Sequence, residues 1–357
     1  MSLSFPLILG LILGAIMAFL VTNMVMKWRV LDHPNDRSMH SISTPKAGGL
    51  GIMAGVLVTL SIAALDPGLG VLSPPVMALV ALALMTGLLG LYDDVYDLPA
   101  KLKFLILAAL SLGATLYLAP VQSFALDKAQ ITLPFWVALG GTALWIFVLS
   151  NAANFMDGAD GLITSSSLAA AAFMALLAME AGNSMAVLMA LAIMVALIGF
   201  LPLNLPTAQI FLGDTGALFI GFWFGALALL YIHNGPPGAV YAVVLIFMPW
   251  LSDILLTMAW RLAHHKNLLQ AHNDHLYQLA LRRGASHARV TLVMTIQTVL
   301  CGALAWLFRA SATSELLALA AVAVLAIIVH WWARALFAAS QNDANPAYDD
   351  NGPAPGH

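Results

Sequence analysis

Apolar runs long enough to cross a lipid bilayer follow one another along almost the whole 357-residue chain. Each crossing by a helix needs about 20 predominantly apolar residues. Polar residues, Pro and Gly divide the chain into eleven runs, at 3–27, 48–65, 75–92, 102–119, 133–150, 162–180, 185–201, 215–232, 239–259, 291–308 and 315–337. Charged residues make up only 9% of the chain, about a third of the share usual in soluble domains. We therefore predict an all-α, polytopic membrane protein with about eleven transmembrane helices.

Basic residues are concentrated in alternate connections between the predicted spans. One side of the membrane receives only Lys128 and Arg309, and the other side receives the remaining 12 of the 14 Lys and Arg residues. Because connections on the cytoplasmic side carry the excess of Lys and Arg, we predict that the amino terminus lies outside. Residues 1–340 then form a single integral membrane domain. The Pro-, Gly- and Asp-rich segment 341–357 is predicted to be a disordered cytoplasmic tail.

Acidic residues gather where the third run meets the predicted cytoplasmic side, in the segment GLYDDVYDLPAKLKF. On a continuing helix, Asp93 and Asp97 would share a face, with Asp94 beside them. Adjacent carboxylates repel each other unless a cation lies between them, and hard oxygen ligands suit Mg²⁺. The alternative is a solvated loop with ordinary acids, in which Lys101 and Lys103 are membrane-flanking anchors.

Two further acidic segments lie at the same predicted membrane face. In NAANFMDGADGL, Asn154 lies three residues before Asp157 and Asp160 three residues after it, so a helical turn would bring amide and carboxylate together. Asp160 as a helix N-cap is the alternative. In IFLGDTGAL, Asp214 precedes the eighth run, a position that the helix dipole favours by itself. Three separate segments that carry Asp to one face are more specific, and they predict one shared site.

Basic and histidine-containing segments on the same predicted face suit phosphate groups. The segment DHPNDRSMHSISTPKAGG carries Arg37, His40 and Lys46 beside a Gly-rich helix start, a combination that suits an anionic phosphate. The excess of bases on the cytoplasmic side explains the same residues without a ligand. In AHNDHLYQ, His272 and His275 could bind a metal, or could donate neutral hydrogen bonds to a phosphate or a sugar.

Together these segments offer carboxylates for a divalent cation and bases for phosphates. This combination indicates phosphoryl transfer between a soluble anionic donor and a lipid-borne acceptor. The alternative is a membrane transporter with a carboxylate-lined cation path, which needs ionisable groups near the midplane of several spans. Only Asp253, in the ninth run, comes close, and it can also be a structural pairing partner. Cys301 is the single cysteine, so no disulfide framework and no thiolate metal cluster is expected.

The five quoted motifs occur in the same order in a known family. Over roughly residues 30–290, the chain resembles the polyprenyl-phosphate N-acetylhexosamine-1-phosphate transferases, or glycosyltransferase family 4. The resemblance implies transfer of a sugar 1-phosphate from a UDP-sugar to undecaprenyl phosphate, with release of UMP. It also implies Mg²⁺, with Mn²⁺ as a substitute, and a multi-pass location in the bacterial inner (cytoplasmic) membrane. A catalytically inactive relative that serves as an assembly scaffold is a further alternative, although every motif keeps its acids.

The resemblance also implies roles for individual residues. Asp214 matches the principal Mg²⁺ ligand of the family. The positions that match catalytic residues are Asp93, Asp94, Asp157 and Asp160. The positions that match substrate-binding residues are Arg37, His40, Lys46, Asn154, Asn204, His272 and His275. Either the lipid phosphate attacks directly or an Asp first forms a covalent intermediate. We favour direct attack, because one metal-bound site can align both phosphates.

The histidine motif departs from the family pattern. The sequence HNDH replaces a longer histidine cluster, with Asn273 and Asp274 in between, and Ala217 stands where Ser is common. The short form resembles the subgroup that initiates O-antigen and related surface-polysaccharide lipids. The donor implied is UDP-N-acetylglucosamine, UDP-N-acetylfucosamine or UDP-N-acetylquinovosamine. The expected partners are these substrates and the lipid bilayer, without nucleic acid, and the sequence leaves a homodimer open.

Overall fold

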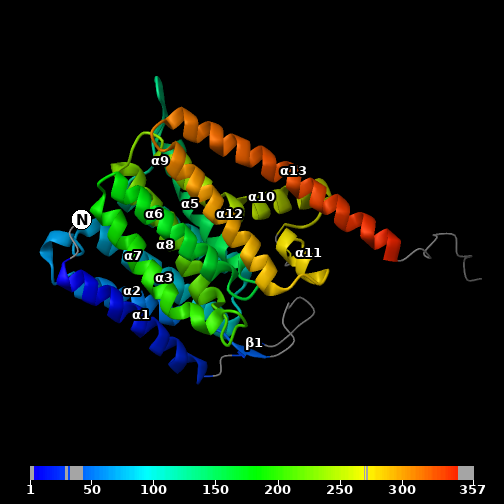
Figure 1. Cartoon of the computed structure of the whole chain (residues 1–357), viewed down its shortest axis with the longest axis horizontal. Coiled ribbons are helices and arrows are strands. Elements are labelled where there is room, and N and C mark those ends of the chain that lie inside the picture. Colours follow the sequence, from blue (N-terminus) through cyan, green and yellow to red (C-terminus); the bar gives the residue numbers. More distant parts are fainter. Residues whose placement is uncertain (1–3, 29–30, 33–42, 269, 271, 345–357) are drawn as a thin grey trace, which may run out of the picture.

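The computed structural model describes residues 4–28, 31–32, 43–268, 270 and 272–344, and most of them lie in helices (Figure 1). The helices are α1 (Phe5–Met26), α2 (Gly49–Ala63), α3 (Pro74–Tyr96), α4 (Ala100–Leu118), α5 (Phe135–Met156), α6 (Leu162–Glu180), α7 (Ser184–Asn204), α8 (Gly213–Asn234), α9 (Ala239–Ile246), α10 (Met248–Ala263), α11 (Leu276–Arg282), α12 (His287–Phe308) and α13 (Ala312–Ala344), with a 3₁₀ turn at Pro67–Leu69. Strand β1 (Leu31–Asp32) pairs with β2 (Thr44–Pro45), and β3 (Ser123–Leu126) pairs with β4 (Ala129–Thr132), both antiparallel. The predicted all-α class is confirmed.

Nine helices in the described part of the chain are long and apolar enough to cross a membrane, namely α1, α3 to α8, α12 and α13. Helices α9 and α10 pass the same test together, as a tenth span. Helix α2 is apolar but has only 15 residues, a length of about 22 Å. Each of the predicted runs therefore contains a helix, and the polytopic membrane architecture is confirmed.

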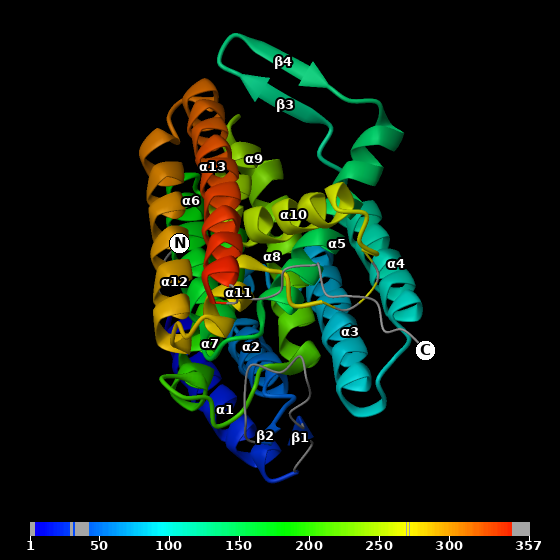
Figure 2. The same ribbon diagram turned by 90° about the vertical axis from the view of Figure 1, so that its right-hand side faces the viewer.

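The predicted ninth span is broken. Helices α9 and α10 meet at Phe247 with a bend of 71°, and in Figure 2 α10 lies crosswise to α12 and α13. Pro249, at the start of α10, lacks the N–H that a continuous helix would use, and its ring clashes with the preceding turn. The prediction of one continuous helix over 239–259 is therefore wrong.

Helix α8 forms the centre of the bundle. Of the residues in its most apolar 18-residue window, 94% are buried, and it packs against α2, α3, α5 and α7. Its first turn is held by close backbone contacts. A Cβ on Gly90 of α3 would lie 2.2 Å from the carbonyl oxygen of Asp214, and one on Gly49 of α2 would lie 2.2 Å from Gly216. Glycine at these positions lets α2 and α3 approach the start of α8 closely, which fixes the backbone that carries Asp214.

Different strands and helix ends lie at the two ends of the bundle. The β3–β4 hairpin lies at one end, and β1 and β2 lie at the other, together with the start of α8 and the end of α3 (Figure 2). Helix α13 continues to Ala344, past the predicted domain boundary at residue 340. The rest of the predicted tail, residues 345–357, lies outside the described residues.

Candidate active site

The carboxylate of Asp94, near the end of α3, caps the start of α8. It accepts hydrogen bonds from the backbone N–H of Asp214 (3.2 Å), the backbone N–H of Thr215 (3.0 Å) and the Thr215 hydroxyl (2.7 Å). Lys46 Nζ lies 3.8 Å from the same carboxylate. An anionic acceptor is favoured at the first turn of a helix, where backbone N–H groups have no partners within the helix. Asp94 therefore positions Asp214, and its predicted catalytic role stays a prediction.

Lys103, in the first turn of α4, joins two of the predicted acids. Its ammonium lies 2.6 Å from Asp93 Oδ2 and 2.7 Å from Asp214 Oδ2. The other oxygen of Asp93 accepts a hydrogen bond from the backbone N–H of Leu98 (2.7 Å). The alternative that Lys103 is only a membrane-flanking anchor is wrong, because its charge lies between two carboxylates.

Asp97 does not join this cluster. It adopts a left-handed conformation (φ 49°) and ends α3 at Tyr96, with its side chain exposed. A residue with positive φ at this position terminates a helix instead of extending it. The expectation that Asp93 and Asp97 share a helix face is therefore wrong.

The end of α5 brings two more predicted residues to the start of α8. Asn154 Nδ2 lies 3.3 Å from Asp214 Oδ2, and the backbone N–H of Gly213 donates to the carboxylate of Asp157. Burial, followed by the nearby Asp214 and Asp94 carboxylates, raises the pKa of Asp157 well above its usual range. The predicted convergence of Asn154 and Asp157 with Asp214 is confirmed.

Asp160 has a different environment. Its Oδ2 accepts a hydrogen bond from the backbone N–H of Ala208 (3.2 Å), and His287 Nδ1 lies 3.2 Å from its Oδ1. Its carbonyl oxygen accepts from the Thr291 hydroxyl (2.7 Å). The N-cap of α6 is Gly161, with φ 67°, so the alternative that Asp160 caps this helix is wrong. These contacts tie the segment after α5 to α12 and to the α7–α8 connection, and a catalytic role for Asp160 stays a prediction.

Asn204, at the end of α7, is buried within the fold. Its Oδ1 accepts a hydrogen bond from the Thr164 hydroxyl (2.7 Å), and its Nδ2 donates to the Ile210 carbonyl (3.1 Å). These bonds hold the α7–α8 connection. Neither bond reaches the cluster around Asp214, so substrate binding by Asn204 stays a prediction.

The two predicted histidines lie beside the end of α5. His275 is 2% exposed and lies between the rings of Phe155 and Tyr277, with centroids 6.1 Å and 6.2 Å away. The Tyr277 hydroxyl donates to the Phe155 carbonyl (2.8 Å), which docks α11 against the segment that carries Asp157.

His272 lies next to His275, with ring centroids 5.0 Å apart. Burial, followed by the neighbouring His275 and Arg261, lowers the pKa of His272 to about 4. His272 is therefore neutral near pH 7, which suits the interpretation of a neutral hydrogen-bonding group for a phosphate or a sugar.

Asp253 has the structural partner that the sequence left open. Its carboxylate accepts hydrogen bonds from the backbone N–H groups of Leu276 (2.9 Å) and Tyr277 (3.3 Å), and from the Thr257 hydroxyl (3.2 Å). It thus caps α11 and holds the histidines in place.

Lys46 reaches the site through backbone pairing with the segment before α8. Phe211 N–H donates to the Pro45 carbonyl (2.8 Å), and Gly49 N–H donates to the Leu212 carbonyl (3.0 Å). The other two predicted phosphate-binding residues of this segment, Arg37 and His40, lie outside the described residues.

The residues at the start of α8 fit a hard divalent cation in their chemistry. Asp93 and Asp214 already hold one positive charge, the Lys103 ammonium, between their oxygens. Carboxylate and amide oxygens are the ligands that Mg²⁺ prefers. Among the described residues, no three His, Cys, Asp or Glu side chains are grouped closely enough to hold a metal as they stand. Lys103 lies where a cation shared by Asp93 and Asp214 would sit, so an ion bound to both carboxylates would displace its ammonium.

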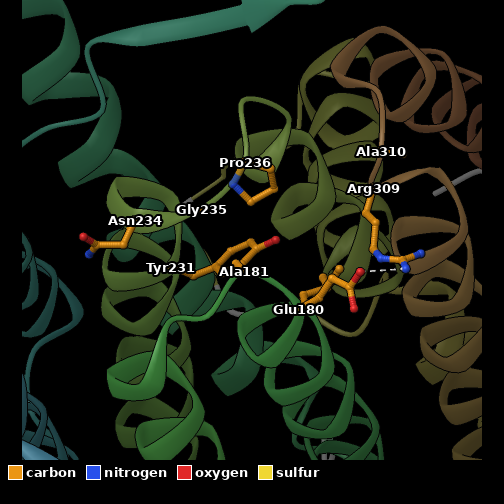
Figure 3. Close-up of a pocket in the computed structure, with 9 residues that line it drawn as sticks. Glu180, Ala181, Tyr231, Asn234, Gly235, Pro236, Arg309 and Ala310 are labelled. Carbon is orange, nitrogen blue, oxygen red and sulfur yellow. Dashed lines mark hydrogen bonds and ion pairs between the residues drawn. The ribbon is translucent and has the colours of Figure 1, made fainter. Parts of the chain in front are cut away.

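A cavity of about 440 Å³ lies at the other end of α8, away from these acids (Figure 3). Tyr231 and Asn234 line it, together with Glu180 and Arg309, which form an ion pair at 3.0 Å. Asp214 and Tyr231 are separated by about 25 Å along the helix. The cavity is therefore not part of the carboxylate cluster.

The fold and the cluster define a polytopic membrane protein with acids and lysines from several helix ends gathered at one end of the bundle. Comparison with known proteins shows which family it is: the glycosyl transferase family 4 profile matches residues 76–232. The chain is 30% identical to decaprenyl-phosphate N-acetylglucosaminephosphotransferase of Mycobacterium tuberculosis, over 73% of this chain and 71% of the relative. It is 28% identical to the probable undecaprenyl-phosphate N-acetylglucosaminyl 1-phosphate transferase of Bacillus subtilis, over 80% and 79%. It belongs to glycosyl transferase family 4, and the resemblance found in the sequence is confirmed.

Proposed function

We propose that this protein transfers an N-acetylhexosamine 1-phosphate from a UDP-sugar to undecaprenyl phosphate and releases UMP. The observation that carries the proposal is the cluster at one end of a membrane bundle, where Lys103 joins Asp93 and Asp214 and where Asp157 lies near Asp214. The names of its relatives, which are polyprenyl-phosphate N-acetylglucosamine-phosphate transferases, support the same reaction. We place the site on the cytoplasmic face of the bacterial inner membrane, because 12 of the 14 basic residues belong to the predicted side of the acidic motifs. The product would initiate a lipid-linked surface polysaccharide of the O-antigen type.

The reaction we favour is a direct displacement. An oxygen of the lipid phosphate attacks the phosphorus that carries the sugar, the bond from this phosphorus to the UMP oxygen breaks, and UMP leaves. Asp214, with Asp93 beside it, would hold Mg²⁺, and the chemistry that the ion supplies when bound is neutralisation of charge on the phosphates. Lys46 and Lys103 provide further positive charge for the same groups. Asp94 already accepts hydrogen bonds from α8, and Asp93 accepts them from Leu98 and Lys103. Asp157 is therefore the better candidate for taking a proton from the lipid phosphate.

The test uses the purified full chain with Mg²⁺, undecaprenyl phosphate and a panel of UDP-N-acetylhexosamines. We expect release of UMP and a lipid product heavier by one sugar 1-phosphate, detected by mass spectrometry. The donor that gives this product identifies the sugar. Asp214→Ala is expected to abolish the reaction, and UMP release undiminished by this substitution would overturn the role of Asp214.

The bent span α9–α10 favours the transporter alternative, whereas the contacts of Asp253 do not. A bent span such as α9–α10 is common in transporters. However, the carboxylate of Asp253 in α10 is bonded to the backbone of α11 and therefore caps a helix. Substrate uptake by proteoliposomes that contain no lipid acceptor would favour transport over transfer.

A further inference from the structure

Arg334, near the end of α13, is a buried charge that the proposed chemistry does not use. It is 8% exposed. Its Nε donates to His330 Nε2 (2.7 Å), and its Nη2 donates to the Thr257 hydroxyl (3.0 Å) and to the Asp274 carbonyl (2.7 Å). The guanidinium also lies over the Trp260 ring, 4.2 Å from the centroid. A buried charge is costly unless its partners are well placed, so these contacts indicate a defined task for Arg334.

Arg334 donates a hydrogen bond to the backbone carbonyl of Asp274. Asp274 lies in the sequence between His272 and His275, the two histidines of the site. Arg261 binds the Asp274 carboxylate, and Lys266 Nζ lies 3.6 Å from it. Side chain and backbone of Asp274 are thus fixed from two helices, α10 and α13. We name residues 272–275 the histidine segment. Its position depends on both helices.

A second contact joins α13 to the other end of α11. The Arg283 guanidinium donates to the Phe337 carbonyl and lies 4.9 Å from the centre of the Phe337 ring. The end of α13 lies beside α11 in Figure 2, and the two helices are in contact. Because α11 has only 7 residues, contacts on both sides of it leave little freedom for the histidine segment.

The exposure pattern of α13 argues against a helix that is only a membrane anchor. Only 11% of its most apolar window is buried, and residues such as Ile328 and Trp332 are exposed. Over the same stretch, His330 and Arg334 are buried. They lie one turn apart and therefore share a face. At these two positions the inward side of α13 is therefore polar, and Arg334 is directed at α10 and at Asp274.

We propose that α13 is a clamp that holds the histidine segment in its donor-binding position, with Arg334 as the positioning residue. The term donor-binding rests on the function proposed above. The mechanical part of the proposal, restraint of 272–275 by α13, does not depend on it. Arg334 acts through Asp274 and touches none of the acids at the start of α8.

The test compares Arg334→Met, Arg334→Lys and the matched control Arg282→Met in the purified full chain. Arg282 is exposed on α11, so its removal deletes the same kind of side chain without loosening the clamp. The first measurement is amide hydrogen exchange of peptides that cover 272–282, without substrates. We expect faster exchange in Arg334→Met, intermediate exchange in Arg334→Lys, and wild-type exchange in Arg282→Met. Equal exchange in Arg334→Met and the control would overturn the clamp.

The second measurement separates KM from kcat for the UDP-sugar. Loss of one charged hydrogen bond that orders a binding segment predicts about a 10-fold rise in donor KM, with kcat changed by less than about 3-fold. A fall in kcat at unchanged KM would refute the positioning role. If Arg334→Met does not fold, His330→Phe removes the acceptor of its Nε at similar volume, and Arg334→Lys supplies a partial loss. A wild-type chain that releases no UMP but shows the exchange pattern would refute the proposed function and leave the clamp standing.

Discussion

Replacing Asp94 by Asn tests whether this acid acts mainly by holding the first turn of α8. The carboxylate accepts three hydrogen bonds there, from Asp214 N–H, Thr215 N–H and the Thr215 hydroxyl. An amide keeps one acceptor oxygen and turns its NH₂ group toward an N–H donor, and it also loses the charge that suits a helix N-terminus. We expect the free energy of unfolding to fall by about 2–4 kcal/mol. For a chain of 357 residues, the unfolding midpoint should drop by about 3–5 °C.

The assay is thermal unfolding in detergent beside UMP release, with Thr215→Val as the matched control. This control removes only the hydroxyl donor at 2.7 Å, so we expect a smaller loss, of about 1–2 kcal/mol. Thr215 has no acid–base role, but if Asp94 acts by holding the first turn of α8, Thr215→Val should also lower activity, as Asp94→Asn does. The reasoning is refuted if Asp94→Asn unfolds at the wild-type midpoint with no activity while Thr215→Val is fully active. That pair of results would assign Asp94 a chemical role.

Two other predictions concern charge in the site. Lys103→Met leaves the Asp93 and Asp214 carboxylates without the ammonium between them. We therefore expect a lower unfolding midpoint in EDTA, and a larger rise of this midpoint on addition of Mg²⁺, than in the wild type. A midpoint that does not respond to Mg²⁺ would contradict this. The pKa of His272 is lowered from its ordinary value of 6.5 to about 4 in the folded chain. Between these two pH values, His272 binds a proton in the unfolded chain but not in the folded chain. The free energy of unfolding therefore declines as the pH falls from 6.5 to about 4. His272→Asn should flatten that decline in pH-dependent unfolding, and equal slopes in both proteins would rule out the assignment.

The sequence was sufficient to predict the parts of the fold that depend on hydropathy. The eleven runs each contain a helix, because the requirement for apolar residues at membrane depth acts on every span separately. The meeting of Asp93, Asp157 and Asp214 was also predictable, because alternate connections of a polytopic chain return to the same face. In the structure, α3 and α5 both pack against α8, and this packing brings the three acids close together.

Other features depend on contacts that no single segment reveals. The sequence offers an anchor role for Lys103 only as an alternative and does not predict its contact with Asp93 and Asp214. The short connection between α3 and α4 makes the two helices neighbours and could have indicated that Lys103 lies beside Asp93. The break at Phe247 was missed because a Pro in an apolar run does not tell a kinked span from a broken one. The contacts of Asp160 with Ala208 and His287 join residues distant in sequence, and pattern alone cannot supply them.

The burial of α8 has a consequence for the membranes in which the protein can work. Membranes of different lipid composition differ in thickness, and the resulting mismatch acts on helices that touch lipid. Helix α8 is surrounded by other helices of the bundle, so its height is set by packing against protein. Asp214 should therefore keep its depth relative to Asp93 and Asp157 when the acyl chains lengthen or shorten.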